Sequence, residues 1–493
     1  MKGKKLAALL LSMSLFASIV AGCGNSGKGT DNTGTGTGTG NNATTTTATD
    51  EVATIKWVTV GNGMPDNYDA WKKNINSYLG EKIGVNIEME VIPWGDWDSR
   101  RSVLVNTGGD YDILFTNSGT YTSDVKLGAF MDISDLVKTS ASDLYNYIPS
   151  DYWDASKVDG KIYAVPTYKD SSATQYFVWD EKLAKDNGIE VEKITSLKDL
   201  VEPMKKLKEA TGSAPFILSS SGLEAIFGMS YDSMSSGLPA IGVKYDDETR
   251  TVVNVFEQKD IMDQLSVLHE MYKAGIINAD APTLAETPSY RPFFVAQGWS
   301  LAAKTTWGPN MGVDAVAIQW GDTIVSNETV QGSLNCISAN TKYPEKCLEF
   351  LQMVNLDTYV RDAFYYGLEN DNFKYTEDKK IERLNTDWSM AGYTQGTFFT
   401  VSQLATDEFN QWDEVKELNA KAKGSVLLGF SFDTSSVADE LSNCIEIYRR
   451  YKSELLTGMA EPVSTVKEMI KEMNDAGLQK IIEEAQNQIN ASF

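Results

Sequence analysis

The feature that most constrains the fold is an alternation of strand-like and helix-like segments near the start of the globular part. Three runs are rich in β-branched and aromatic side chains, which is typical of strands: residues 54–60, 85–92 and 111–115. Between them, residues 68–79 carry apolar residues at helical spacing, and a second helix is predicted over residues 96–106, ending at Gly108-Gly109. Alternating strands and helices predict a parallel sheet with right-handed crossovers, and hence an α/β fold.

The loops that follow these strands are the first place to look for a binding site. Ligands of parallel sheets bind beyond the carboxyl ends of the strands. None of these loops contains GxGxxG, so none of them is a phosphate loop. They do carry the polar and aromatic side chains that a sugar needs for its hydroxyl groups and its apolar face. The predicted ligand-binding residues here are Asn62, Trp94, Trp97, Asn117, Ser118 and Tyr121. The structural alternative for each is packing, capping or turn formation.

The first fifty residues indicate export. Residues 1–22 combine three lysines, an apolar stretch too short to span a bilayer and a small-residue ending, which predicts a signal peptide. Val20-Ala21-Gly22-Cys23 resembles the lipobox of bacterial lipoproteins, in which the cysteine is lipidated and becomes the mature N-terminus. Residues 23–50 are rich in Gly and Thr and read as a flexible tether. The alternative is an ordinary signal peptide with an incidental cysteine.

Charge and cysteine content narrow the function classes. The formal net charge is −24, and loss of the three lysines in residues 1–22 makes it about −27, which opposes binding to nucleic acid. Besides Cys23 there are Cys336, Cys347 and Cys444, and the only histidine is His269. A Cys/His metal site is therefore not expected, and neither a metal nor a cofactor is predicted. Cys336 and Cys347 are either bridged or small buried thiols.

The C-terminal tail reads as amphipathic surface helices. Apolar residues recur at helical spacing on both sides of Gly477. Thr465 and Glu468 have the spacing of a capping box and predict a helix start there. Acidic residues are interleaved throughout, which favours packing on a domain over membrane insertion.

Several motifs together resemble family 1 extracellular solute-binding proteins, in particular a subgroup of sugar-transporter lipoproteins. They occur in the family's order from Cys23 almost to the end: residues 80–94 (GEKIGVNIEMEVIPW), 109–113 (GDYDI), 126–133 with Leu136, 159–166 (DGKIYAVP), and 429–433 (GFSFD) with Tyr451, Gly458, Pro462, 476–478, Gln486 and Gln488. Each motif alone is loose, and their order and spacing make the set specific.

The resemblance implies a two-lobe periplasmic-binding-protein-like fold of type II, with a hinge between the lobes and a helical C-terminal segment. The expected first lobe comprises residues 51–167 and about 338–395. The expected second lobe comprises residues 168–337 and about 396–493.

The resemblance also implies further site residues. By analogy with maltose-binding proteins, the first crossing between lobes lies near residues 165–170, which adds Tyr168 and Asp170 as candidates. Trp307 stands where those proteins have a stacking tryptophan, although residues 301–304 and 307–309 carry strand and turn signals. The weaker candidates are Tyr231, Trp299, Tyr366 and Glu369. In contrast, Trp57, Trp71 and Trp179 sit on strand or helix patterns and are expected to be core residues.

The implied function is capture of a solute, an oligosaccharide by preference, for an ABC importer whose permease subunits are separate chains. The protein is expected to be a monomer, held on the extracellular face of the cell membrane by the lipid on Cys23. One alternative is a sensor that presents ligand to a membrane receptor. A second is a secreted carbohydrate-active enzyme, but GxSxG and HExxH motifs are absent and nothing selects the carboxylate pairs Asp96/Asp98 or Asp110/Asp112.

Overall fold

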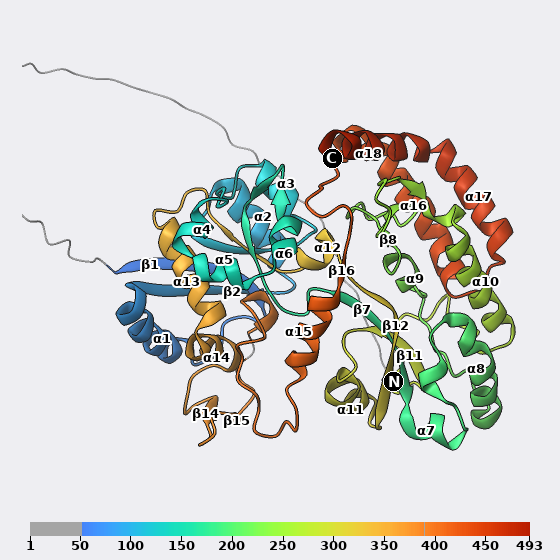
Figure 1. Ribbon diagram of the computed structural model, residues 1–493, viewed down its shortest axis with the longest axis horizontal. Helices are drawn as coiled ribbons and strands as arrows, with labels where there is room; N and C mark the ends of the chain where they lie inside the picture. Colours follow the sequence, from blue (N-terminus) through green and yellow to red (C-terminus); the bar gives the residue numbers. More distant parts are fainter. Residues whose placement is uncertain (1–51, 389) are drawn as a thin grey trace, which may run out of the picture. The chain divides into compact units, whose positions relative to one another are not determined.

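The computed structural model describes residues 52–388 and 390–493 (Figure 1). The predicted signal peptide, Cys23 and the tether lie outside the described residues. No described helix is both long enough and apolar enough to cross a bilayer.

The first sheet has five strands in the order β2-β1-β3-β13-β6. β1 pairs in parallel with β2 and β3, so the predicted parallel sheet is confirmed. β13 runs antiparallel to both β3 and β6. The elements up to this sheet's last strand are β1 (Ala53–Gly61), α1 (Tyr68–Ile83), β2 (Val85–Pro93), α2 (Trp97–Thr107), β3 (Ile113–Thr116), α3 (Tyr121–Lys126), α4 (Leu136–Ser140), α5 (Ser142–Tyr147), α6 (Ser150–Ala155), β4 (Lys157–Val158), β5 (Lys161–Ile162) and β6 (Ala164–Pro166).

Both faces of the first sheet are covered, as parallel strands require. On one face, Trp57 and Trp71 are at most 1% exposed and pack with helices α1, α13 (Pro344–Leu356) and α14 (Thr358–Tyr366). On the other face, α2 and α3 contribute Leu104 and Tyr121 to a second cluster. The strands bury apolar side chains on both faces of the sheet, so the sheet is rigid and the ends of its strands have fixed positions.

The second sheet has four strands in the order β11-β7-β12-β16, with β7 antiparallel to both neighbours. Trp179 on β7 is fully buried in the largest apolar cluster, beneath the C-terminal helices. The elements of this part are β7 (Ala173–Asp180), α7 (Glu181–Asp186), α8 (Leu197–Thr211), α9 (Ala225–Gly228), β8 (Tyr231–Asp232), β9 (Ile241–Lys244), β10 (Val253–Asn254), α10 (Lys259–Lys273), β11 (Phe293–Gln297), a π-helical turn (Ala303–Trp307), α11 (Gly308–Met311), β12 (Ala315–Val325) and α12 (Asn327–Val330).

The chain then returns to the first sheet and crosses again. β13 lies between β3 and β6 and therefore belongs to the first sheet. The chain thus crosses from the second lobe to the first before β13, whereas the expected boundary near residue 338 placed this strand in the second lobe. The remaining elements are β13 (Leu334–Ile337), β14 (Phe373–Tyr375), β15 (Ile381–Arg383), α15 (Gln411–Lys421), β16 (Lys423–Gly424), α16 (Ala438–Leu456), α17 (Pro462–Asp475) and α18 (Leu478–Ser492). β16 pairs with β12, which joins the tail to the second sheet.

The tail forms the three helices α16, α17 and α18, in red in Figure 1. The capping box predicted at Thr465 and Glu468 is wrong, because α17 begins three residues earlier, at Pro462. The Glu461 carboxylate accepts hydrogen bonds from the backbone N–H groups of Val463 and Ser464, at 3.1 and 2.8 Å. Proline at the first helical position needs no N–H partner, so Glu461 and Pro462 together fix the start.

The three cysteines of the described part are free and buried. Of the two alternatives for Cys336 and Cys347, the structure has the buried thiols. Burial raises the pKa of Cys444 to about 11, so its unreactive thiol form dominates at neutral pH.

We therefore expect these three thiols to resist a thiol-specific reagent in the native protein and to react fully once urea unfolds it, without any reductant. Mass spectrometry of the labelled peptides measures the outcome. An adduct on Cys336 and Cys347 that appears only after reduction would contradict the prediction.

Candidate functional site

Four loops converge on one edge of the first sheet. They follow the carboxyl ends of β1, β2, β3 and β6, because β6 and β3 run the same way on either side of β13. This edge carries the predicted residues Asn62, Trp94, Asn117 and Asp170. The structure thus brings together residues from four separate segments, as the parallel sheet predicted.

Trp94 is the centre of an aromatic platform at this edge. Its side chain is 50% exposed, which is unusual for a large aromatic surface. The indole N–H donates to the Asn62 side-chain oxygen at 3.0 Å, and the ring lies nearly parallel to Tyr393, with centroids 6.2 Å apart and an interplanar angle of 10°. An indole fixed by a hydrogen bond and backed by a second ring offers a rigid apolar plate to a ligand.

Charged groups stand beside the platform. Lys169 Nζ lies 5.7 Å from the centre of the Tyr393 ring and 2.8 Å from a carboxylate oxygen of Asp170. Asp170 remains partly exposed, so its second oxygen is available to a ligand hydroxyl. Aromatic plates next to hydroxyl-binding polar groups are the combination that binds a sugar ring. We call Asn62, Trp94, Lys169, Asp170 and Tyr393 the aromatic platform.

Tyr393 was missed by the sequence analysis, and its place is set by long-range contacts. Its backbone oxygen accepts from the Ser333 hydroxyl at 2.8 Å, and the next carbonyl, that of Thr394, accepts from the Asn335 amide at 3.0 Å. Beneath this loop, Arg361 is fully buried and donates to the carbonyls of Gly392 and Thr397, at 2.9 and 2.6 Å. No local motif marks the loop, so no sequence signal could have found it.

The second lobe contributes a separate aromatic group near the end of β11. The Trp299 indole N–H donates to the Gln411 side-chain oxygen at 3.2 Å, and its ring lies 5.6 Å from that of Trp412, a residue that sequence reasoning missed. Trp307 is half-buried at the end of the π-helical turn, against Tyr176 at 6.1 Å. The strand and turn expected at residues 301–309 are therefore wrong, since Gly308 and Pro309 continue into α11.

The other predicted site residues make protein contacts. Trp97, Tyr121, Tyr168, Tyr231 and Tyr366 are at most 7% exposed, which leaves them no surface for a ligand in this conformation. Three of their hydroxyls donate hydrogen bonds within the protein: Tyr121 to the Ser156 carbonyl, Tyr231 to the Asp260 carboxylate and Tyr366 to the Ser402 carbonyl. Glu369 is half-buried and lies away from the platform, near Trp71 and Tyr359.

Of the two carboxylate pairs that a hydrolase could have used, Asp110/Asp112 has structural partners. Asp112 accepts from the Lys56 backbone N–H at 2.8 Å and from the Thr341 hydroxyl at 2.6 Å, and Asp110 pairs with Lys56 Nζ at 3.2 Å. Both precede β3, at the opposite end of that strand from the platform. Within residues 52–388 and 390–493, no group of three or more His, Cys, Asp or Glu side chains is placed to hold a metal ion.

Comparison with known proteins decides the family. A family model described as bacterial extracellular solute-binding protein matches residues 73–367, more than half of the chain. The chain belongs to this family. A second model, described only as a domain of unknown function, matches residues 426–492, which we call the C-terminal segment.

Two relatives extend over most of this solute-binding protein. A carbohydrate ABC transporter substrate-binding protein of Streptococcus pneumoniae is 28% identical over 456 residues, which is 88% of this chain and 90% of the relative. The N-glycan transport solute binding protein NgtS of the same species superposes with a TM-score of 0.79 at 26% identity, over 89% of this chain and 98% of NgtS. Such neighbours are two-lobe solute-binding proteins, and the fold expected from the resemblance is confirmed.

Proposed function

We propose that the chain is the substrate-binding component of an ABC importer and that it captures a neutral oligosaccharide on the aromatic platform. The observation that carries this proposal is the half-exposed Trp94, held by Asn62 and backed by Tyr393 at the strand-end edge. Covering the exposed part of this ring with the apolar face of a ligand removes apolar surface from water, which favours binding. NgtS has been crystallised with Man1GlcNAc and with Man5GlcNAc, which makes the same class of ligand the first to test here.

Closure of two lobes on the ligand is the proposed mechanism. The TM-score with NgtS is 0.79 for one of its structures and 0.68 and 0.65 for those with Man1GlcNAc and Man5GlcNAc. All three are structures of NgtS at 26% identity to this chain, and we infer that the lower TM-scores of the two glycan complexes come from a change of conformation. This supports a ligand-linked population shift, in which the oligosaccharide binds the closed form more tightly than the open form.

The membrane anchor is part of the proposal. A receptor that delivers ligand to membrane permeases gains from being tethered near them, because tethering raises the effective concentration. The lipobox-like ending at Cys23 and the Gly/Thr-rich tether would supply this, with the acidic receptor on the extracellular side. Metabolic labelling with a fatty-acid analogue would show lipid on the wild-type chain and none on Cys23→Ala.

A thermal-shift panel tests the ligand class. We expect Man1GlcNAc, Man5GlcNAc or related neutral oligosaccharides to raise the unfolding midpoint of the purified protein. A ligand at a hundred times its Kd adds about 2.7 kcal/mol to the free energy of unfolding. A shift with peptides alone, and none with any glycan, would contradict the oligosaccharide proposal. Release of a shortened glycan product would contradict the assignment as a binding protein.

A further inference from the structure

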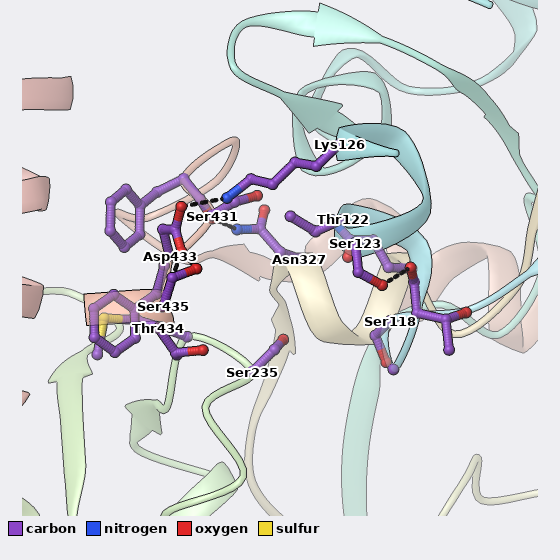
Figure 2. Close-up of a pocket in the computed structure, with 16 residues that line it drawn as sticks. Ser118, Thr122, Ser123, Lys126, Ser235, Asn327, Ser431, Asp433, Thr434 and Ser435 are labelled. Carbon is purple, nitrogen blue, oxygen red and sulfur yellow. Dashed lines mark hydrogen bonds and ion pairs between the residues drawn. The ribbon is translucent and has the colours of Figure 1, made fainter. Parts of the chain in front are cut away.

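Apart from the aromatic platform, the protein has a pocket where α3 of the first lobe meets the C-terminal segment. This pocket is lined mainly by hydroxyl groups (Figure 2). Its volume is about 270 Å³, that of roughly nine water molecules, which suits one sugar ring rather than a long chain. Ser118 and Thr122 line it from the first lobe, and Ser431 and Thr434 from the C-terminal segment. Ser235, which follows β8, completes the lining on the side of the second lobe. We call these five residues the hydroxyl pocket.

The five side-chain hydroxyls of this pocket are free to bind a ligand, whereas Asn327 behind them is fully hydrogen-bonded within the protein. The five side chains make no hydrogen bond to another described residue, so each keeps a donor and two acceptor positions. Asn327, by contrast, donates to the carbonyls of Leu427 and Phe430 at 3.1 and 2.6 Å and accepts from the Gly429 N–H at 2.9 Å. The loop that carries Ser431 is therefore built around Asn327.

A second clamp holds the other end of the same loop. The Gln488 amide on α18 donates to the Asp433 backbone oxygen at 2.8 Å and accepts from the Asp433 N–H at 2.9 Å. Thr434 follows directly, so its position is fixed by the last helix of the chain. A wall that is rigid before binding loses little entropy when a ligand arrives.

The charge of the pocket selects a neutral ligand. Lys126 Nζ and an Asp433 carboxylate oxygen are 2.6 Å apart, and these are the charged side chains of the lining. The hydrogen bonds from Lys126 and Ser435 hold the pKa of Asp433 well below its usual range, so the two charges coexist and cancel. An anion or a cation would find no unpaired partner, while Phe430 and Phe432 offer apolar surface beside the hydroxyls. Hydroxyl groups around an apolar patch match a monosaccharide unit.

We propose that the hydroxyl pocket binds a second sugar unit of the same oligosaccharide and that the C-terminal segment thereby selects for ligand length. Trp94 follows β2 and Ser118 follows β3, and β1 lies between these strands. The two strand ends are thus about 10 Å apart, since neighbouring strands are spaced by roughly 4.8 Å. One sugar ring does not reach from the aromatic platform to the hydroxyl pocket, and a chain of several units does. This inference rests on the proposed oligosaccharide function.

Isothermal titration of the purified full chain with a short and a long ligand tests it. We expect the double variant Ser431→Ala/Thr434→Val to weaken Man5GlcNAc binding by about tenfold or more, because each lost hydrogen bond contributes a factor of roughly two to ten. N-acetylglucosamine, a single ring that the aromatic platform can hold alone, should change by less than about twofold. Thr107→Val is the matched control, because this exposed hydroxyl bonds only to the Val103 carbonyl of its own helix.

The outcomes separate the two proposals. Equal affinity of the double variant and the wild type for Man5GlcNAc would overturn the hydroxyl-pocket inference. The oligosaccharide function would stand if Trp94→Ala weakened binding by the expected factor of about thirty or more. An equal loss for both ligands would also overturn it, because the effect would then not depend on length. Failure of the wild type to bind any glycan would instead remove the proposed function and this inference with it.

Discussion

Replacing Trp94 by alanine should lower the affinity for the oligosaccharide by at least about thirtyfold. Truncating a central aromatic anchor costs roughly 2 kcal/mol or more, and 1.4 kcal/mol corresponds to a factor of ten in Kd. The loss combines the missing plate with the Asn62 side chain left without its indole partner. Titration of the variant with the best ligand of the panel measures it.

Stability should hardly change in the same variant. Trp94 is half exposed and belongs to none of the buried clusters, so its removal leaves no cavity. Tyr343→Ala is the matched control, since this aromatic residue of the first lobe is 40% exposed and precedes α13. Wild-type affinity in Trp94→Ala, with an unchanged unfolding midpoint, would remove the aromatic platform from the site.

The sheet that positions the platform was predictable because its information is local. Runs of β-branched residues and helical spacing recur over residues 54–115, and each run could be read without knowing its partner. The rule that ligand loops follow parallel strands then placed Asn62, Trp94 and Asn117 at one edge. The place of β13 in this sheet could not be predicted in the same way, because this antiparallel strand is more than 150 residues from β3 and β6 in the sequence and nothing near it indicates which strands it pairs with.

The rest of the site depends on long-range contacts that cannot be predicted from the sequence. Tyr121 and Tyr366 have the composition of binding residues, but their hydroxyls find backbone carbonyls and their rings fill the core. Tyr393 has no helical or strand pattern around it, and only the folded chain shows that it backs Trp94. Of the hydroxyl pocket only Ser118 was a predicted candidate, since the pocket's serines and threonines come from three distant segments.

Arg361 explains how the loop bearing Tyr393 keeps its shape. Its guanidinium is fully buried and its hydrogen-bond acceptors are neutral: the carbonyls of Gly392, Gly396 and Thr397 and the side-chain oxygen of Gln395. Burial lowers the pKa of Arg361 to about 10, so it stays charged at neutral pH. A planar fork of donors holds several carbonyls at fixed angles, which an ammonium group cannot do.

Arg361→Met should therefore reduce the free energy of unfolding by about 3–5 kcal/mol, because several buried carbonyls lose their donor at once. Urea denaturation measures this loss. Arg100→Met is the control, since Arg100 forms an exposed pair with Glu90 at 2.9 Å and should cost at most about 1 kcal/mol.

Amide hydrogen exchange under native conditions distinguishes a local role from general destabilisation. If Arg361 orders the loop, Arg361→Met should speed exchange at residues 392–397 more than in the strands of the first sheet, and ligand affinity should fall because Tyr393 no longer backs Trp94. Arg361→Lys should give a smaller loss of both, since the charge remains while the fork is gone. A methionine variant within about 1 kcal/mol of the wild type would show that the loop holds without this arginine.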